Sequence, residues 1–489
     1  MRGRRWKNRR GIAGTKGLVV ALALAWAIAV SALAGDVRGE VGHGRELPPY
    51  AVQPPGASFE GYPRIGPRQQ VRILREVLAA SLGRLVREPV RSASQVSRRM
   101  TERLTVRARE LSVWAVPTGP HAALPCGSGD LGGTFGGPVL PARLTLLPSS
   151  EASVQGLLAS IARAERRIDL MIYGWEDDAT GREVAAALSA RARRGTTVRL
   201  LVDRAAFLIH NPAAARNEGT FLDALRAVPN VTVIEPPDPF FQFDHRKLAV
   251  FDDRLVWSGG MILTEVARRR WENLAFLAEG PIVASYSRVF EERWREVGGA
   301  PATLDLAAAE TAPIVSNAVV RMVRTDVRSR SLKETVYHAV DHARHHIYLE
   351  NPYFSDTLLA DHLIAARKRG VDVRVVVTLR GNVAKLNRYV TLTANRLFRG
   401  GVRVSLAPTM THVKAMSIDG VWAYIGTGNF DELSLRNNRE VGLSVTSPDV
   451  VRTLDQSVFL PHQAQAEALR TLLPTPKHRV LLELMALWY

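Results

Sequence analysis

Cysteine is almost absent from this chain of 489 residues, because Cys126 is the only one. No intrachain disulfide can form, and a zinc site built from several cysteines is excluded. Long apolar runs are equally scarce, since the sequence has only one, from Leu18 to Ala34. This argues against a protein that crosses a membrane many times. Acidic residues are outnumbered, 47 against 65 Lys and Arg, and the formal net charge of +18 favours anionic partners such as phospholipid surfaces, nucleic acid or phosphate esters.

The apolar run follows a strongly basic start. Residues 1–16 contain seven basic residues and no acid, and the run ends in Ala32-Leu33-Ala34, a pattern of small residues typical of signal-peptide cleavage sites. Residues 1–34 are therefore predicted to be either a cleaved export signal or a retained N-terminal anchor. In both cases we expect the body of the chain outside the cytoplasm, in a periplasmic or extracellular location. Removing these seven charges from +18 leaves +11, which weakens the argument for nucleic acid.

The composition and the hydrophobic pattern change at about residue 150 and divide the rest of the chain in two. Residues 35–146 predict an extended arm, basic amphipathic helices and a Gly/Pro-rich linker. From about residue 150, short apolar strands alternate with helices, and one pattern of helix, strand, helix and strand occurs twice. The predicted ranges are 161–167, 168–173, 183–194 and 197–203 in the first copy, and 336–346, 347–350, 358–369 and 371–377 in the second.

This alternation predicts an α/β fold, with mixed sheets flanked by helices. Because the pattern is repeated, we expect two similar lobes, at about 147–310 and 311–460, related by a pseudo-twofold axis. The N-terminal extension precedes them, and residues 461–489 are predicted to form a C-terminal helical tail.

One short motif occurs once in each lobe, with a constant offset of 167 residues between the copies. Its members are His245, Lys247 and Asp252 in the first lobe and His412, Lys414 and Asp419 in the second. A glycine turn follows, 14 residues after each histidine: Gly259 and Gly260 in the first copy, and Gly426, Thr427, Gly428 and Asn429 in the second. Two copies at equal spacing within a larger repeat are hard to obtain by chance.

The spacing of the motif has a chemical meaning. Residues i and i+2 of a strand point to the same face, so the histidine and lysine of each copy project together. If the lobes pack about a twofold axis, two imidazoles and two ammonium groups meet, which suits a phosphodiester: the lysines hold its oxygens, one histidine attacks phosphorus and the other protonates the leaving oxygen. A carboxylate on the distal ring nitrogen would fix each imidazole, and Glu272 and Glu440 are the candidates.

At these residues the sequence resembles the phospholipase D superfamily, in particular its bacterial phospholipase D and cardiolipin synthase branch, over about residues 147–460. The resemblance implies two α/β domains that share one active site, no metal or other cofactor, and a phosphohistidine intermediate. By position, His245 resembles the nucleophile and His412 the general acid/base. Lys247, Lys414 and Asn429 match phosphate-holding positions, and the neighbouring Thr427 and glycines are expected to contact substrate. Asp252 and Asp419 are expected to brace the strand and turn.

One position departs from the family pattern, because Ile262 stands where the first motif commonly has an asparagine. The function predicted first is an exported phospholipase D that cleaves the distal phosphodiester of glycerophospholipids to phosphatidate and a free head group. The alternatives are a cardiolipin synthase-like transphosphatidylase, a nuclease of the same superfamily and a non-catalytic lipid-binding protein. Expected partners are a phospholipid or membrane surface and a water or alcohol acceptor, and nucleic acid is not expected. The protein itself is expected to be a monomer.

Overall fold

The computed structural model describes residues 131–203, 221–236, 243–311, 314–382 and 384–474, all within one compact unit of the chain. The predicted signal or anchor at 1–34 lies outside the described residues, as do most of the predicted arm and linker and the end of the predicted tail. Within the described part, no helix is both long and apolar enough to span a bilayer.

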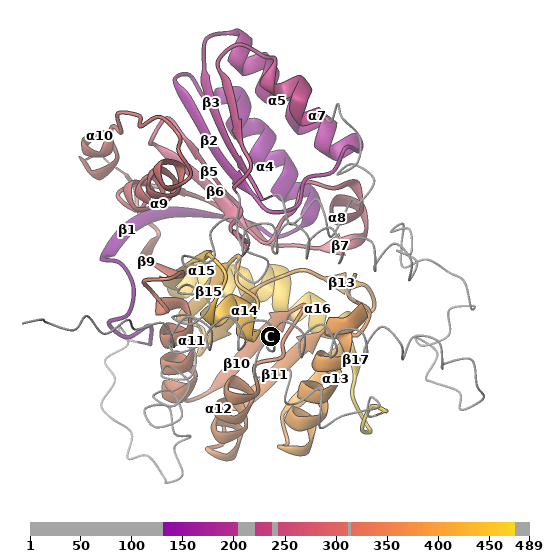
Figure 1. Cartoon of the computed structure of the whole chain (residues 1–489). Helices are drawn as coiled ribbons and strands as arrows, with labels where there is room; N and C mark the ends of the chain where they lie inside the picture. Colours follow the sequence, from indigo (N-terminus) through magenta and orange to yellow (C-terminus); the bar gives the residue numbers. More distant parts are fainter. Residues whose placement is uncertain (1–130, 204–220, 237–242, 312–313, 383, 475–489) are drawn as a thin grey trace, which may run out of the picture. The chain divides into compact units, whose positions relative to one another are not determined.

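A mixed sheet of 15 strands runs through this unit (Figure 1). The strands of the N-terminal half are β1 (Val139–Leu147), β2 (Arg167–Ile172), β3 (Thr197–Val202), β4 (Val231–Ile234), β5 (Leu248–Phe251), β6 (Leu255–Gly259) and β8 (Ala275–Glu279). Those of the C-terminal half are β9 (Ala318–Thr325), β10 (His346–Asn351), β11 (Asp372–Val377), β12 (Arg403–Leu406), β14 (Ala415–Ile418), β15 (Trp422–Gly426), β16 (Glu440–Thr446) and β17 (Glu467–Ala468).

Apart from β17 at one edge, the strand order is the same in both halves when it is followed outward from the centre of the sheet. β1 and β9 pair antiparallel at the centre. The order continues as β8-β6-β5-β2-β3-β4 on one side and β16-β15-β14-β10-β11-β12-β17 on the other. In each half the three strands β2, β3 and β4, or β10, β11 and β12, are parallel, and the remaining neighbours are antiparallel. This order fits two similar lobes, while the pseudo-twofold axis itself stays a prediction.

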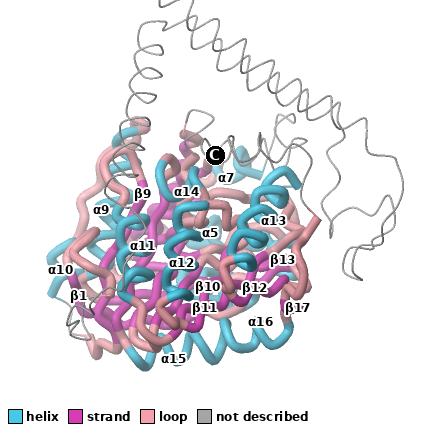
Figure 2. The backbone as a smooth tube through the Cα atoms, turned by 90° about the horizontal axis from the view of Figure 1, so that it is seen from below, coloured by secondary structure: helices cyan, strands magenta, loops and turns pink. Residues whose placement is uncertain are grey.

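Helices cover the sheet. Those before residue 312 are α4 (Ser150–Arg163), α5 (Ala179–Arg193), α7 (Phe221–Arg226), α8 (Glu265–Arg270), α9 (Ile282–Glu296) and α10 (Leu306–Thr311). Those that follow are α11 (Ser331–His342), α12 (Thr357–Lys368), α13 (Ala384–Arg399), α14 (Glu432–Arg436), α15 (Pro448–Leu454), the π-helical turn η4 (Asp455–Phe459) and α16 (Leu460–Gln465). Figure 2 shows α11, α12 and α13 side by side along β10 and β11, with α15 and α16 on the opposite side. The predicted α/β class is confirmed.

The predicted repeat is present as α4-β2-α5-β3 and α11-β10-α12-β11, but the first helix of each copy ends about four residues before its predicted end. The physical reason is the same in both copies. Backbone N–H groups of residues 165–167 donate to the Asp252 carboxylate, and those of residues 344–346 donate to Asp419. These donors are drawn out of the helix into a turn that leads directly into β2 or β10.

Two segments differ from the predicted boundaries. β1 occupies the end of the predicted linker, and its pairing with both β8 and β9 makes it the strand that joins the two halves. After α16 the chain turns extended as β17, which pairs antiparallel with β12. The described part of the predicted helical tail is therefore helical only at its beginning.

Candidate active site

The first histidine–lysine pair lies immediately before β5. His245 and Lys247 are both buried. The Lys247 ammonium donates to the backbone oxygen of His245 at 2.7 Å and lies 4.8 Å from the ring centre of Tyr173, at the end of β2. The same tyrosine ring meets the His245 imidazole edge-on, with 4.6 Å between ring centres. Tyr173 therefore supports both members of the pair.

The second pair repeats this arrangement before β14. The Lys414 ammonium donates to the backbone oxygen of His412 at 2.9 Å, and both side chains are buried. Trp271 packs beside the His412 ring, with 5.1 Å between ring centres. The two pairs thus have the same local backbone geometry and different aromatic neighbours.

Backbone hydrogen bonds tie each histidine to the opposite half of the molecule. His245 N–H donates to the Arg439 oxygen at 3.1 Å, and His412 N–H donates to the Glu272 oxygen at 2.7 Å. The latter bond continues a short parallel ladder between β7 (Trp271–Glu272) and β13 (Met410–Thr411). These reciprocal bonds bring the two motifs into one site.

A carboxylate supports the first imidazole. His245 Nδ1 lies 2.8 Å from Glu440 Oε1, and the glutamate is buried. Thr427 and Ser434 donate their hydroxyls to Oε2 and Oε1 of Glu440, at 2.5 and 2.7 Å. Burial raises the pKa of Glu440 to about 8, although the nearby ammonium of Lys247 opposes this. Glu440 is therefore the carboxylate partner expected on the ring nitrogen of a motif histidine, and that histidine is His245.

Glu272 does not take the corresponding place, and its predicted role is wrong. Its carboxylate is 45% exposed and lies 3.9 Å from His462 Nε2, while only its backbone oxygen meets His412. The His412 ring is held by the next residue, with Asn273 Oδ1 3.0 Å from His412 Nδ1. The spacing of the repeat contains the missed signal, because Asn273 follows His245 by 28 residues, as Glu440 follows His412 by 28.

The positive charges of the site are buried and close together. Burial lowers the pKa of Lys247 to about 7, and burial together with repulsion from Lys247 lowers the pKa of Lys414 well below its usual range. The pKa of His245 is lowered by burial and then by both ammonium groups. A phosphodiester anion placed among these groups would relieve their repulsion and favour their charged forms.

The role of Asn429 in holding phosphate stays a prediction. Asn429 is buried, and its Oδ1 accepts no hydrogen bond in the described part of the chain, so only its amide nitrogen could donate to a phosphate oxygen. Its side chain bonds to Asp431, whose pKa burial raises to about 7. The Thr427 hydroxyl donates to Glu440, a bond that was not predicted, and its expected contact with substrate stays a prediction.

The glycines of the two turns leave room for close approach of the backbone. A Cβ on Gly260 would lie 2.6 Å from the backbone oxygen of His412. One on Gly259 would lie 2.5 Å from Ala275 Cα, and one on Gly426 would lie 2.6 Å from the Tyr424 hydroxyl. These contacts give the glycines a packing role, which is most direct at Gly260, where any side chain would displace the second histidine segment.

The motif aspartates lie in turns, away from the rings. Asp252 and Asp419 adopt φ values of +54° and +56°, and each carboxylate accepts three backbone N–H bonds from the segment that precedes β2 or β10. Asparagine and aspartate tolerate this left-handed conformation better than most residues. The geometry therefore favours the bracing role expected for them.

Ile262 fills an apolar gap. Its side chain is 2% exposed within the core of the first lobe, and its Cγ2 would lie 3.1 Å from a Cβ on Gly174. Asn273 does not replace the missing amide donor, because its Nδ2 donates to Ser150 Oγ at 2.9 Å and the Ala267 oxygen at 3.3 Å.

Among the described residues, no group of three or more His, Cys, Asp and Glu could hold a metal ion.

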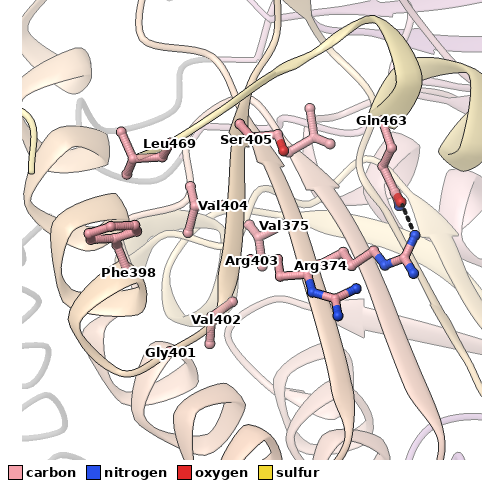
Figure 3. A pocket seen from close by; sticks show the side chains of 12 residues that line it. Arg374, Val375, Phe398, Gly401, Val402, Arg403, Val404, Ser405, Gln463 and Leu469 are labelled. Atoms are coloured by element: carbon pink, nitrogen blue, oxygen red, sulfur yellow. Dashed lines mark hydrogen bonds between the residues drawn. The ribbon is translucent and has the colours of Figure 1, made fainter. Parts of the chain in front are cut away.

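A cavity of about 440 Å³ lies elsewhere, over β11 and β12 beside α13 (Figure 3). Its apolar floor includes Phe398 and Val404, and on its rim Arg374 contacts Gln463, as Figure 3 shows. None of the motif histidines or lysines lines it. The cavity is therefore separate from the candidate active site.

The comparisons with known proteins agree with this geometry. The family described as cardiolipin synthase, phospholipase D-like domain, matches residues 157–294 and 336–458, which are the two lobes that carry the motifs. These segments make up more than half of the chain, and the chain belongs to this family. The predicted resemblance to the phospholipase D superfamily, in its cardiolipin synthase branch, is confirmed.

Individual relatives point to the same branch. The chain is 26% identical over 324 residues to cardiolipin synthase A of Cronobacter sakazakii, covering 62% of this chain and 65% of that protein. It is 27% identical over 337 residues to a probable cardiolipin synthase of Bacillus subtilis, covering 64% of each. The match thus spans about 65% of the length of these relatives. The crystal structure of phosphatidylserine synthase from Haemophilus influenzae superposes with a TM-score of 0.55 at 16% identity, covering 72% of this chain and 95% of that one, which supports the fold.

Proposed function

We propose that this protein is a phosphatidyl transferase of cardiolipin synthase type. The observation that carries the proposal is the single buried cluster in which two histidine–lysine pairs meet, with His245 backed by Glu440. Hydrolysis, which the sequence predicted first, has less support than the transphosphatidylase alternative, because the relatives are named as cardiolipin synthases.

The geometry suits a two-step transfer. When Glu440 is ionised, its carboxylate accepts the Nδ1 proton of His245, so that Nε2 carries the lone pair that attacks phosphorus. The new N–P bond forms as the P–O bond to the leaving alcohol breaks, and protonated His412 gives that oxygen its proton. The acceptor alcohol then loses its proton to His412, attacks phosphorus and releases His245. Phosphatidylglycerol in both roles yields cardiolipin and glycerol, whereas water as acceptor yields phosphatidate.

The two lysines and Asn429 stabilise the charge on the phosphoryl oxygens in this proposal. Buried donors aimed at such oxygens contribute strongly, because little water screens them. The proposed reaction uses no metal or cofactor, as the family resemblance implies. A membrane surface as partner and an exported or anchored location belong to the same proposal and rest on the sequence pattern of residues 1–34. A monomeric state is proposed because one chain carries both motifs.

The test uses the full chain with phosphatidylglycerol vesicles in EDTA, and measures cardiolipin, glycerol and phosphatidate together. Cardiolipin with an equal amount of glycerol is the expected result. Phosphatidate with glycerol and no cardiolipin would restore the hydrolytic prediction. No turnover of phosphatidylglycerol or phosphatidylcholine, with or without divalent metal, would contradict the proposal. The doubly substituted His245→Ala, His412→Ala protein is the matched control.

A further inference from the structure

The two halves of the site differ in a coordinated way around the histidine rings. At the constant offset of 167 residues, four positions correspond between the halves but carry different chemistry. Thr427, Asn429, Ser434 and Glu440 in the second half correspond to Gly260, Ile262, Ala267 and Asn273 in the first. At the positions of Glu440, Thr427 and Ser434, the first half therefore has neither a carboxylate nor a hydroxyl.

In the second half, the carboxylate of Glu440 is stabilised by outside donors. Thr427, Ser434 and the His245 ring all approach its two oxygens within 2.8 Å. A buried carboxylate only accepts hydrogen bonds when it is ionised, so it needs such donors. The two hydroxyls and the carboxylate form one functional unit.

In the first half, the side-chain amide of Asn273 finds other hydrogen-bond partners. Ser150 Oγ donates to the Trp271 oxygen at 2.6 Å, so it can only accept from Asn273 Nδ2. The second amide hydrogen is directed at the Ala267 oxygen. Two acceptors therefore fix the amide nitrogen, and Asn273 Oδ1 must face His412 Nδ1. This assigns the ring proton of neutral His412 to Nδ1, so the lone pair is on Nε2.

We propose that Asn273 is a positioning residue that holds His412 through a neutral amide and thereby sets the pH range over which His412 delivers its proton. The inference rests on the proposed function for its catalytic meaning, but the hydrogen-bond assignment stands on geometry alone. The amide oxygen of Asn273 accepts the Nδ1 proton without adding a negative charge, whereas a carboxylate in its place would favour the doubly protonated ring. A neutral partner suits a residue that must protonate a leaving alcohol and then accept a proton again.

Other charged groups near His412 do not depend on this position. Lys414 donates to the His412 backbone oxygen, and Lys247 lies close enough to Lys414 to lower its pKa. Glu350 bonds the adjacent Thr411, and the Glu272 carboxylate faces His462. None of these contacts involves the Asn273 side chain, so a substitution there changes the partner of the His412 ring and leaves them in place.

The test is the variant that combines Asn273→Asp with Ala267→Ser, which supplies the carboxylate and the hydroxyl that corresponds to Ser434. A carboxylate beside a charged partner commonly moves titration by about 1–3 pH units. We expect the alkaline limb of the kcat–pH profile for cardiolipin formation to move up by about 1 unit or more, with KM unchanged. Ala267→Ser alone is the control and should leave the limb in place. A folded double variant whose limb stays where the wild type has it would overturn the proposal.

A second measurement does not require activity. Nitrogen NMR of the histidine rings, assigned with His412→Ala, should show the neutral His412 ring of the wild type protonated at Nδ1, and Asn273→Ala should lose that preference. Protonation at Nε2 in the wild type would overturn the assignment. If the wild type turns over no phospholipid, the proposed function fails, and the ring measurement still decides the role of Asn273.

Discussion

The two lobes share their backbone and differ in the chemistry that they place on it. Both have the same strand order, the same lysine-to-histidine-oxygen bond and the same aspartate turn. Their ring partners differ, because Glu440 meets one histidine and Asn273 the other. Backbone geometry depends on hydrogen bonds that many sequences satisfy, so it persists in both copies. Ring partners influence proton affinity, and in the proposed mechanism the two histidines have different tasks, which different partners would suit.

Removing either imidazole tests whether the two copies are both required and should have the largest effect. His245→Ala and His412→Ala should each lower phosphatidyl transfer by at least about 10³-fold, since nucleophile and acid act in series. The turnover of purified variants measures this, with His345→Ala as the control. Near-normal turnover of either variant would contradict a shared site. Base-stable, acid-labile phosphate trapped on His412 instead of His245 would reverse their roles.

Asn429 tests whether the second lobe alone supplies an amide to the phosphate. Asn429→Ala should lower kcat by about 100-fold, the size seen when one donor to a developing oxyanion is removed. Thermal unfolding of the same variant controls for misfolding. Unchanged kcat would show that this asparagine does not hold phosphate and that the lobes do not differ in this respect.

The buried lysines, one from each lobe, predict that kcat/KM depends on pH, and Lys247 sets the expected range. Burial lowers the pKa of Lys247 to about 7, so the free enzyme loses this positive charge as the pH rises above that value. An anionic diester binds the charged form, so kcat/KM should fall by up to about tenfold per pH unit above pH 7. A profile of kcat/KM from pH 5 to about 9 measures this. A flat profile above pH 7 would mean that the lysine stays charged without substrate.

Ile262 sharpens the contrast at the position opposite Asn429. Ile262→Asn would restore the amide of the family pattern, but its site is apolar and closed. The buried amide lacks partners there, so we expect a loss of about 1–3 kcal/mol in unfolding free energy and no gain in turnover. Denaturant unfolding measures the loss, and Ile262→Val provides the size control. A stable and more active Ile262→Asn protein would show that the amide reaches the phosphate.

Substitutions of the two turn aspartates should have similar effects, and these should be the smallest of those predicted here. Asp252→Asn and Asp419→Asn keep the tolerated backbone conformation and weaken the bonds to three backbone N–H groups. We expect each to cost about 1–2 kcal/mol of stability with little change in kcat. Urea unfolding of both variants, with turnover measured in parallel, checks this. A selective loss of turnover in one variant would give that aspartate a role in the chemistry.

The sequence by itself determined the repeat and the motif. Strands 248–251 and 415–418, next to the histidines, have the apolar pattern that strands need, and the helices between strands end at basic residues and glycine. Such features are local, so they depend on spacing along the chain. The equal spacing also matches Asn273 with Glu440. The expectation of a carboxylate at this place favoured the neighbouring Glu272 instead.

Only the tertiary structure decided which groups meet. Glu440 reaches a histidine 195 residues earlier, and Asn273 reaches one 139 residues later, because the two lobes exchange backbone bonds across the site. The Thr427 hydroxyl meets Glu440, and the Glu272 carboxylate lies near His462 and not near His412. Hydrogen bonds form between groups that face each other in space. Their choice depends on strand register and side-chain direction, which the packing of the two lobes fixes and the residue order alone leaves open.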